Sequence, residues 1–560
     1  MKRLDLSGAA PPAAATPSGW FAMRAPLLPA GVLAASGDAL EASATTDPAR
    51  LAGALAADRA QLRIRLREIV ARPEVREAIF LASPSLEASL PAWERDPEGR
   101  RGPQIERAVF CYVARMAGRP TPFGLFASVS VGAIADHTDL TLDEPASCRR
   151  RTRLGIDYLV ALADAIDRRP EVRERVHVRV NPTLYRAAGR VRYTAAQRTA
   201  ASRTYRLVAA DVTPYLEATL ARAAPGARIA DLARALVEDD PEIALEDAEG
   251  YVRELVDAQL LVSSTAPRVT GGEPIRDLLD GLRDHPELAG MAARLGDAGE
   301  RLAAIDRGGL GAAPDRYREI AQALGGASAL RSLFHVELAR GARGMTLGRE
   351  PVTEILRGVE ILRRLSRPSR SLRRFVEAFA ARYGDAEVPL LEALDEESGV
   401  GFDAPAGSAV AVPLLQGLRI SSEPSVAQLT ARDALLLRKV EQARRTGEPS
   451  VGLSLDELLR PGHDDALPLP AAFHVVARIA ARSPQALSAG DFTVLVETAA
   501  GPSGVHLLAA CRGDDSLLAR LSEHLRAEEA VRPGAVFAEL VHLPEAGAGD
   551  PMVRPVLREY

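Results

Sequence analysis

Two arginines stand four residues apart in RMAGRPTPFGLF, residues 115–126. A helix would place Arg115 and Arg119 on one face, with their Cβ atoms about 5–6 Å apart. An anion bound between them would offset the repulsion, because a forked guanidinium group suits phosphate or carboxylate. The pair therefore predicts an anion site. The alternative is a solvated helix end whose arginines pair with local acids.

The residues after the pair predict a rigid corner. Pro120 and Pro122 each remove a backbone donor and disfavour helix in the residue before them, so they fix the direction of the chain around Thr121. Gly124 allows the chain to turn, and FGLFASVSVGAI then alternates as a strand does, starting at Phe123. The corner would carry two cations and one hydroxyl group.

Composition limits the classes of function. The chain has 560 residues and a net charge of −5, so we expect more than one compact unit and no generally basic surface for nucleic acid. Arginine supplies nearly all the basic residues, which weakens any inference from arginine alone to phosphate.

Three distant cysteines and nine histidines show no metal-ligand spacing, and we expect no metal. The N-terminus lacks a signal peptide and the chain lacks an 18-residue apolar run, so we expect a cytoplasmic protein without a membrane span.

The elements that must position the corner form an α+β pattern. Residues 1–18 are expected to be disordered, and residues 385–412 to be rich in loops. From about residue 428 helix and strand alternate to the end. The expected helices and strands are helices at 52–81, 104–118, 273–306, 316–331 and 351–383, a β-meander at 176–208, and a strand at 334–340.

Residues 176–265 predict a winged helix-turn-helix. Thr213-Pro214 begins the first of three helices, and LLVSS follows the third as a short strand. The third helix is acidic, which disfavours DNA binding because phosphates would repel it. A peptide-binding unit with an exposed edge strand is preferred. The acidic residues of that helix are Glu246, Asp247, Glu249, Glu254 and Asp257.

A basic helical segment at 351–383 is the candidate for gripping a nucleic-acid backbone, with a solvated helix as an equal alternative. We expect Glu377 to be the one acidic residue that offsets the positive charge of this segment. The arginines predicted to contact tRNA are Arg363, Arg364, Arg367, Arg370, Arg373, Arg374 and, in a later segment, Arg512.

Seven ordered landmarks resemble the lantibiotic dehydratase N-terminal (glutamylation) domain of class I lanthipeptide dehydratases. They cover most of the chain beyond residue 20. The landmarks are MRAPLLP, LASPSL (81–86), RMAGRPTPFGLFASVSVG, NPTLYR (181–186), FHVELARG (334–341), VPLLEALDEESGVGF (388–402) and AELVHLPE with VRPVLREY (538–560).

The resemblance implies a site and an activity. Members transfer glutamate from glutamyl-tRNA to Ser or Thr of a precursor peptide. Arg115, Arg119 and Thr121 match residues needed for that step, and Arg24 matches another basic position. Asp157 and Glu337 look like two acidic positions of the same site, although the family more often has Asp in place of Glu337. The unit at 176–265 falls where the family binds the leader peptide.

The resemblance also implies the organisation and partners. We expect a glutamylation domain at 19–175 and 266–560 that is C-terminally incomplete, with no elimination domain. The partners would be a precursor peptide, glutamyl-tRNA as co-substrate, a separate eliminating protein and, as an open possibility, a second copy in a homodimer. No cofactor is implied. Near the C-terminus, LLAACRGDD stands where the family has Gly-Arg-Phe, and AGAGD where it has Arg-x-Gly-Asn. Both departures bear on catalytic competence.

Two further functions stay open. A relative could ligate an aminoacyl group from tRNA onto a peptide C-terminus, using ATP. A non-catalytic module could only capture a leader peptide. A DNA-binding regulator is disfavoured by the acidic helix.

Overall fold

The structure is a computed structural model of the whole chain. Residues 1–14, which hold most of the segment predicted to be disordered, lie outside the described part, as do Arg512 and the last landmark. The described residues are 15–33, 40–42, 45–173, 176–198, 203–263, 274–283, 285–325, 333–367, 369–396, 398–402, 429–459, 467, 469–501, 504–508 and 515–531.

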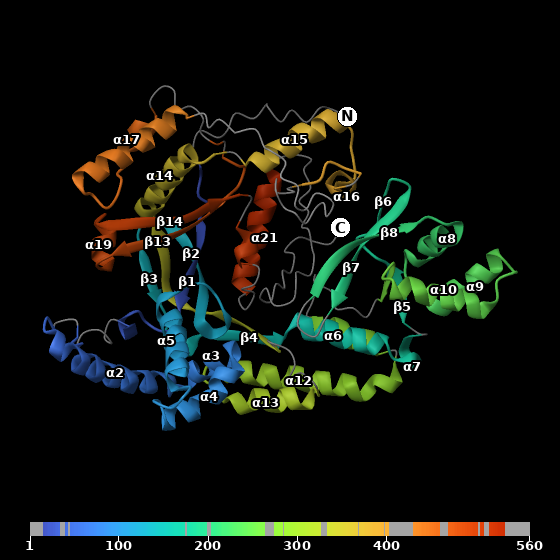
Figure 1. Cartoon of the computed structure of the whole chain (residues 1–560), viewed down its shortest axis with the longest axis horizontal. Coiled ribbons are helices and arrows are strands. Elements are labelled where there is room, and N and C mark those ends of the chain that lie inside the picture. The colour runs from blue at the N-terminus through green and yellow to red at the C-terminus, as the bar shows by residue number, and fades with distance from the viewer. Residues whose placement is uncertain are drawn as a thin grey trace.

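A mixed six-stranded sheet lies at the centre (Figure 1). Strand β2 pairs antiparallel with β1, so that Arg24 lies opposite Val129, and in parallel with both β11 and β12. Strand β4 pairs antiparallel with β11, and β3 with β12. The strands are β1 (Trp20–Pro26), β2 (Ala127–Ala135), β3 (Asp139–Leu142), β4 (Arg149–Leu154), β11 (Phe334–Ala339) and β12 (Ala342–Gly348).

Four helices cover one face of this sheet. Their apolar residues pack with Val336 and Leu338 of β11 and enclose Trp93, which is fully buried. The single helix predicted at 52–81 is two helices, because Pro73 cannot continue the first one and instead starts the second. The four are α2 (Pro48–Val70), α3 (Pro73–Ala82), α4 (Pro84–Arg95) and α5 (Gly102–Gly118).

The opposite face is covered near β1 and β2 by two C-terminal helices, α20 (Val505–Leu508) and α21 (Asp515–Ala530). Val129 packs there against Leu517 and Leu521. The face on which a strand residue lies therefore decides whether it meets the N-terminal helices or the C-terminal ones.

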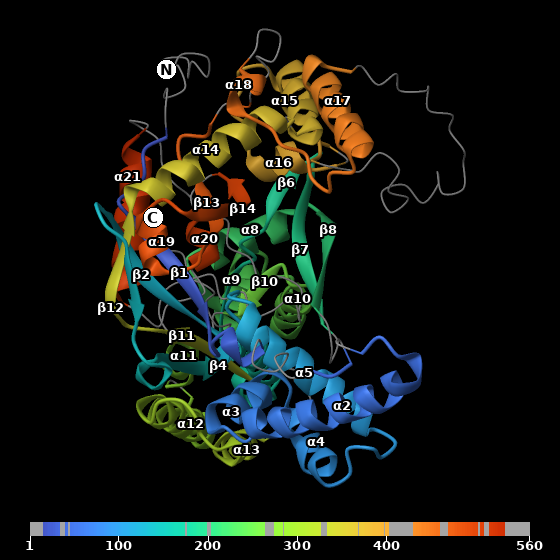
Figure 2. The ribbon, with the colours of Figure 1, turned by 90° about the vertical axis from the view of Figure 1, so that its left-hand side faces the viewer.

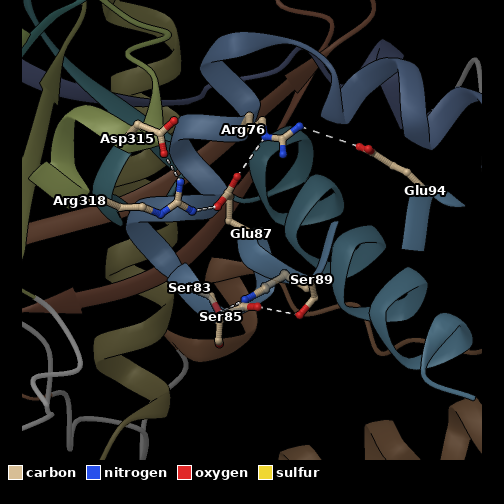
Figure 3. A network of polar contacts seen from close by, with 9 residues as sticks. Arg76, Ser83, Ser85, Glu87, Ser89, Glu94, Asp315 and Arg318 are labelled. Atoms are coloured by element: carbon tan, nitrogen blue, oxygen red, sulfur yellow. Dashed lines mark hydrogen bonds and ion pairs between the residues drawn. The ribbon is translucent and has the colours of Figure 1, made fainter. Parts of the chain in front are cut away.

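The buried carboxylate of Glu87 links the N-terminal helices to a helix that lies far along the sequence. Glu87 of α4 accepts a hydrogen bond from Arg76 of α3 at 3.1 Å and another from Arg318, which also bonds Asp315 (Figure 3). Arg318 and Asp315 belong to α13 (Pro314–Ala323). Ser83 begins α4 as its N-cap, so the LASPSL landmark serves as a helix start that is braced by this network.

A second buried carboxylate, Glu77, lies under strand β4. It pairs with Arg150, and both side chains are fully buried. The Tyr317 hydroxyl donates to Glu77 at 2.7 Å, as do the backbone amides of Gly311 and Ala312 at 2.7 and 3.0 Å. Burial and the neighbouring carboxylate raise the pKa of Tyr317, which keeps its hydroxyl group as a donor. These contacts fix β4 against the helical layer.

The middle of the chain departs from the predicted meander. Strands β6, β7 and β8 form one sheet, and the expected turn at Ala188-Gly189, where both φ angles are positive, joins β6 to β7. Strand β5 instead pairs with β9 and β10, so the first predicted strand belongs to another sheet. The strands are β5 (His177–Val180), β6 (Tyr185–Ala187), β7 (Arg190–Arg198), β8 (Arg203–Asp211), β9 (Ala227–Arg228) and β10 (Leu261–Ser263).

Three helices accompany these strands, as predicted. Thr213 caps the first by accepting a hydrogen bond from the Leu216 amide at 3.1 Å. The helices are α8 (Pro214–Ala223), α9 (Ile229–Asp239) and α10 (Leu245–Asp257).

An ionic contact holds the β6–β7 hairpin against the C-terminal end of helix α16 (Leu390–Leu394), where Asp395 is the C-cap. Asp395 is bound by Tyr185 and, at 3.0 Å, by Arg192. Burial alone would raise the pKa of Asp395, but hydrogen bonds from Tyr185 and Ser398 and the charge of Arg192 lower it to about 2.

The remaining elements complete the two ends of the molecule. Helices α15 and α17 lie at the end opposite α5 in both views (Figures 1 and 2). The predicted helix at 316–331 is α13, which begins at Pro314 and ends at Ala323; residues 326–332 lie outside the described part. The remaining elements are α6 (Ile156–Asp167), α7 (Pro170–Arg173), α11 (Pro274–Leu282), α12 (Ala289–Arg307), α14 (Arg349–Leu365), α15 (Arg370–Tyr383), α17 (Ala431–Thr446), α18 (Leu455–Leu458), β13 (His474–Ala481), α19 (Pro484–Ser488) and β14 (Phe492–Ala500), with short 3-10 turns at Gly124–Phe126, Pro145–Ser147 and Pro286–Leu288.

Within the described ranges, every helix is too short or too polar to cross a membrane. The same residues contain no cluster of three or more His, Cys, Asp or Glu side chains able to hold a metal ion.

Candidate active site

The corner forms where it was predicted, between α5 and β2. Helix α5 ends at Gly118, and Arg119 is its C-cap, extended at φ −117° and ψ 111°, with its amide donating to the Arg115 carbonyl at 3.0 Å. Gly124 has a φ of +53° and begins a 3-10 turn, Gly124–Phe126. The strand therefore begins at Ala127, four residues later than predicted, because the chain first turns there.

Arg115 rests on an aromatic floor. Its guanidinium carbon lies 4.2 Å from the centre of the Phe123 ring and 5.7 Å from that of Phe126. Burial lowers the pKa of Arg115, and the nearby positive charge of Arg119 lowers it further. Within the described part of the chain, neither guanidinium group forms an ion pair. Two cations held close together without a neutralising carboxylate are the arrangement expected of an anion receptor.

The MRAPLLP segment is bonded directly to the corner. The Leu27 amide donates to the Phe126 carbonyl and the Leu28 amide to the Met116 carbonyl, both at 2.9 Å. These bonds connect β1 to the end of α5. Thr121, between the two prolines, is exposed. The hydroxyl and the Arg119 guanidinium are therefore both presented to solvent from a fixed backbone.

Arg24 lies on the face of the sheet that meets the C-terminal helices. Its Nη2 donates to the Leu507 carbonyl of α20 at 3.0 Å. The cross-strand partner of Arg24 is Val129, which packs on α21. Arg24 thus links the first strand to the C-terminal part of the domain.

Glu337 lies on the same face, further along the sheet. Ala339 is aligned with Val129, and alternate residues of a strand share a face, so Glu337 and His335 point to the side on which Arg24 lies. Glu337 is 4% exposed and pairs with Arg153 of β4, whose Nη1 lies 2.8 Å from Oε1. His335 Nε2 lies 3.6 Å from the same oxygen.

Asp157 occupies the first turn of α6, three residues after β4 ends, and is partly exposed. The Gly155 amide donates to the Leu333 carbonyl at 2.8 Å, which holds the start of α6 beside the start of β11. Asp157 therefore lies beyond the end of β4 beside the start of β11, whereas Glu337 lies within the paired part of β11, opposite Arg151.

Three residues of this face were not expected from the sequence: Arg151, Arg153 and His335. Arg151 and Arg153 alternate along β4 with Arg150 and Thr152, which point to the helical layer and bind Glu77 and Asp306, and His335 lies opposite Arg153 on β11. The period-two pattern of RRRTRL and FHVEL could have revealed them once the two strands were known to pair.

The predicted tRNA-contacting arginines are largely engaged with acids. Arg363 and Arg364 bind Glu360, and Arg367 binds Asp433 at 2.5 Å. The prediction that this segment faces only Glu377 was wrong, because Glu360 lies three and four residues earlier on the same helix face. The remaining predicted positions differ: Arg370 begins α15, Arg373 lies 3.8 Å from Glu377, and Arg374 is exposed with no ion pair among the described residues.

A family described as "Lantibiotic dehydratase, N terminus" matches residues 71–560. The chain belongs to this family. Among curated proteins, it is similar to the subtilin biosynthesis protein SpaB of Bacillus subtilis, at 24% identity over 337 residues, which are 59% of this chain and 32% of SpaB.

Solved structures place the fold in the same family. The tRNA-dependent lantibiotic dehydratase MibB from Microbispora sp. 107891 is 26% identical, with a TM-score of 0.68 over 92% of this chain and 47% of MibB. The glutamylation domain of TbtB, from thiomuracin biosynthesis, shares the fold at 20% identity and a TM-score of 0.52, over 94% of this chain and 72% of that domain. The chain thus spans about a third of SpaB and about half of MibB.

Proposed function

We propose that this lantibiotic dehydratase family member transfers glutamate from glutamyl-tRNA to Ser or Thr of a ribosomally made precursor peptide. The observation that carries the proposal is the Arg115–Arg119 pair, held on Phe123 without a described carboxylate partner. The family membership and the likeness to MibB, a tRNA-dependent dehydratase, support it.

The corner suits the anionic part of the substrate. The last nucleotide of glutamyl-tRNA carries a phosphodiester on its 5′ side, and the glutamyl group esterified to its ribose carries a side-chain carboxylate. Each of these anions can accept two hydrogen bonds from a guanidinium group. Arg115 is the more buried of the two cations and cannot move freely on its aromatic floor, so it would fix the substrate's position. Arg119 and Thr121, both exposed, would complete the receptor.

The ester is already activated, so positioning and charge stabilisation suffice for the reaction. The peptide hydroxyl attacks the glutamyl carbonyl, a new ester bond forms, and the bond to the ribose oxygen breaks. A cation beside the carbonyl oxygen would stabilise its developing negative charge. Arg24, Asp157 and Glu337 are proposed to support this site from the sheet and from the start of α6. The residues proposed for catalysis need no further cofactor.

The unit at 176–265 is proposed to be winged-helix-like and to bind the leader peptide. In the described part of the chain, β8 pairs with β7 along one edge, and the sheet order ends at β8. Tyr205 and Leu207 lie two residues apart, on one face of β8, and are 39% and 54% exposed. A peptide strand added to this edge would gain backbone hydrogen bonds and cover both side chains. Leu207→Arg should therefore weaken leader binding about tenfold or more.

The tRNA body is proposed to contact α14 and α15. Because Arg363, Arg364 and Arg367 already bind acids, the exposed face of α15 with Arg373 and Arg374 is the stronger candidate. Helix α15 lies at the opposite end of the molecule from α5 (Figures 1 and 2), so the tRNA would have to extend along the protein.

The test incubates the chain with its neighbouring precursor peptide and glutamyl-tRNA in an ATP-free buffer and follows the intact peptide mass. The proposal predicts one glutamyl residue per modified Ser or Thr. A residue added only when ATP is supplied would point to peptide ligation, and leader binding without any adduct would point to a capture module. Either result would contradict the proposed transfer.

A further inference from the structure

We propose that the side chain of Gln259 takes the place of a third strand beside β7 and thereby holds β8 in the extended form that binds the peptide. The inference rests on the proposed leader-peptide unit and assigns it a positioning residue. It starts from four backbone groups of β7 that are hydrogen-bonded by side chains instead of by a neighbouring strand.

Strand β6 supports only the first part of β7. In an antiparallel sheet, the N–H and C=O groups of every second residue point to the same side. On the side of β7 away from β8, β6 begins at Tyr185, opposite Arg192. In the described part of the chain, no strand lies beside Thr194 and Ala196 on that side. This part of the hairpin would by itself be a two-stranded ribbon, which is marginally stable.

Three side chains complete this edge of β7. The Ala196 amide donates to Gln259 Oε1, and Gln259 Nε2 donates to the Ala196 carbonyl, both at 2.9 Å. The Thr194 amide donates to Thr183 Oγ1 at 2.9 Å, and Asn181 Nδ2 donates to the Thr194 carbonyl at 3.2 Å. Asn181, Thr183 and Gln259 thus form a polar clamp, in which Gln259 makes both of the bonds that a strand residue would make.

The backbone of Gln259 indicates that its side chain is needed there. Helix α10 ends in a Schellman motif, in which the Gln259 amide donates to the Val256 carbonyl at 3.0 Å and the Leu260 amide to the Leu255 carbonyl at 2.9 Å. Gln259 has a φ of +62°, a conformation in which glycine is the usual residue. Glutamine is strained in this position, and such strain persists where the surrounding contacts hold the residue in place. The two bonds to Ala196 are contacts that glycine could not make.

The end of α10 is fixed to β7 at two more points. Asn181 Nδ2 also donates to the Gln259 carbonyl at 2.8 Å, and Asn181 is 6% exposed. The Tyr193 hydroxyl donates to the Ala258 carbonyl at 2.8 Å. Burial raises the pKa of Tyr193, which keeps this hydroxyl group as a donor. The clamp therefore acts from a well-anchored helix end.

The clamp lies directly opposite the exposed residues of β8. In the β7–β8 ladder, Ala196 is aligned with Tyr205 and Thr194 with Leu207. Tyr205 and Leu207 are the side chains that a bound peptide strand is proposed to cover. The bonds on the far edge of β7 thus set the position of the part of β8 that binds the peptide.

Two consequences for peptide binding follow. Because the backbone groups of Thr194 and Ala196 are already bonded, a peptide strand can add to β8 but not to this part of the far edge of β7. A strand that is already held in extended form also loses less conformational entropy when the peptide binds, so the clamp raises affinity. Its loss should therefore act on peptide binding and not on the chemical step.

The experiment compares wild type, Gln259→Gly and Gln259→Glu. It measures the affinity for a fluorescently labelled leader segment of the neighbouring precursor peptide, and KM and kcat for glutamyl transfer to that precursor. Glycine suits the positive φ but removes the amide, whereas glutamate keeps an acceptor for the Ala196 amide and loses the donor to its carbonyl. Both variants should weaken leader binding and raise KM about fivefold to twentyfold without changing kcat. Gln322→Gly, at an exposed glutamine in the last turn of α13, is the matched control and should behave as wild type.

The outcomes separate this role from the proposed function. Wild-type leader affinity in both variants, with weaker binding by Leu207→Arg, would overturn the role of Gln259 alone. Leader binding that Leu207→Arg leaves unchanged would overturn the peptide site on β8 and this role together. A chain that transfers no glutamate but loses leader affinity in both variants would contradict the proposed transfer and still support the clamp. If Gln259→Gly does not fold, Gln259→Glu alone decides by the same measurements, and a lower kcat at unchanged KM overturns the positioning role.

Discussion

Replacing Glu77 by Gln tests whether one buried carboxylate holds strand β4 in place. Glu77 and Arg150 are both fully buried, and the second acid near Arg150, Asp306, lies 3.3 Å from Nε and is itself 17% exposed. Removing one partner of a buried ion pair costs about 3–5 kcal/mol because it leaves an uncompensated charge. Asp306 offsets part of that cost, and the amide oxygen of Gln can still accept from Gly311. We therefore expect a loss of about 3 kcal/mol in the free energy of unfolding.

The assay is urea unfolding followed by the fluorescence of Trp93, which is fully buried in the same helical layer. The matched control is Glu68→Gln, an exposed acid on α2, which should change stability by less than about 0.5 kcal/mol. A loss below about 1 kcal/mol for Glu77→Gln would refute the reasoning, since the buried Arg150 charge would then be tolerated without its partner.

Three further predictions concern the hairpin, the corner and the basic helix. The pKa of Asp395 is lowered to about 2 from an ordinary 3.8, so its contribution of about 2 kcal/mol is present above pH 4 and lost as pH falls toward 2; Asp395→Asn should remove that part of the acid dependence in urea titrations at different pH. Phe123→Leu should slow glutamyl transfer about twofold to fivefold by removing the aromatic floor, whereas Phe110→Leu, at another exposed phenylalanine, should not. Arg374→Ala should lower the salt dependence of tRNA binding by about one unit of slope, while Arg363→Ala, whose cation already binds Glu360, should change it less.

Local rules predicted the parts of the fold that depend on neighbouring residues. Thr213-Pro214 begins a helix, Ala188-Gly189 forms a turn with positive φ, and Gly124 turns the chain after α5. Each of these follows from the conformational limits of one or two residues. The same rules place Glu360 beside Arg363 and Arg364, because residues three and four apart share a helix face.

Pairings between distant segments could not be predicted in this way. Strand β5 lies beside β10 and β9 rather than in the meander, because burial in a second sheet outweighs proximity in sequence. The Arg153–Glu337 contact spans two strands whose pairing no local pattern reveals. The corner was thus predicted as a unit, whereas the composition of the sheet face became visible only in three dimensions.

The central claim is that Arg115 and Arg119 form the receptor for the charged end of glutamyl-tRNA. Its most direct test compares wild type, Arg119→Ala and the control Arg107→Ala, an exposed arginine earlier on α5, by the intact mass of the precursor peptide after incubation with glutamyl-tRNA. We predict glutamyl adducts with wild type and Arg107→Ala, and none with Arg119→Ala, although that variant still binds the leader peptide. Equal adduct formation by Arg119→Ala and wild type would contradict the account.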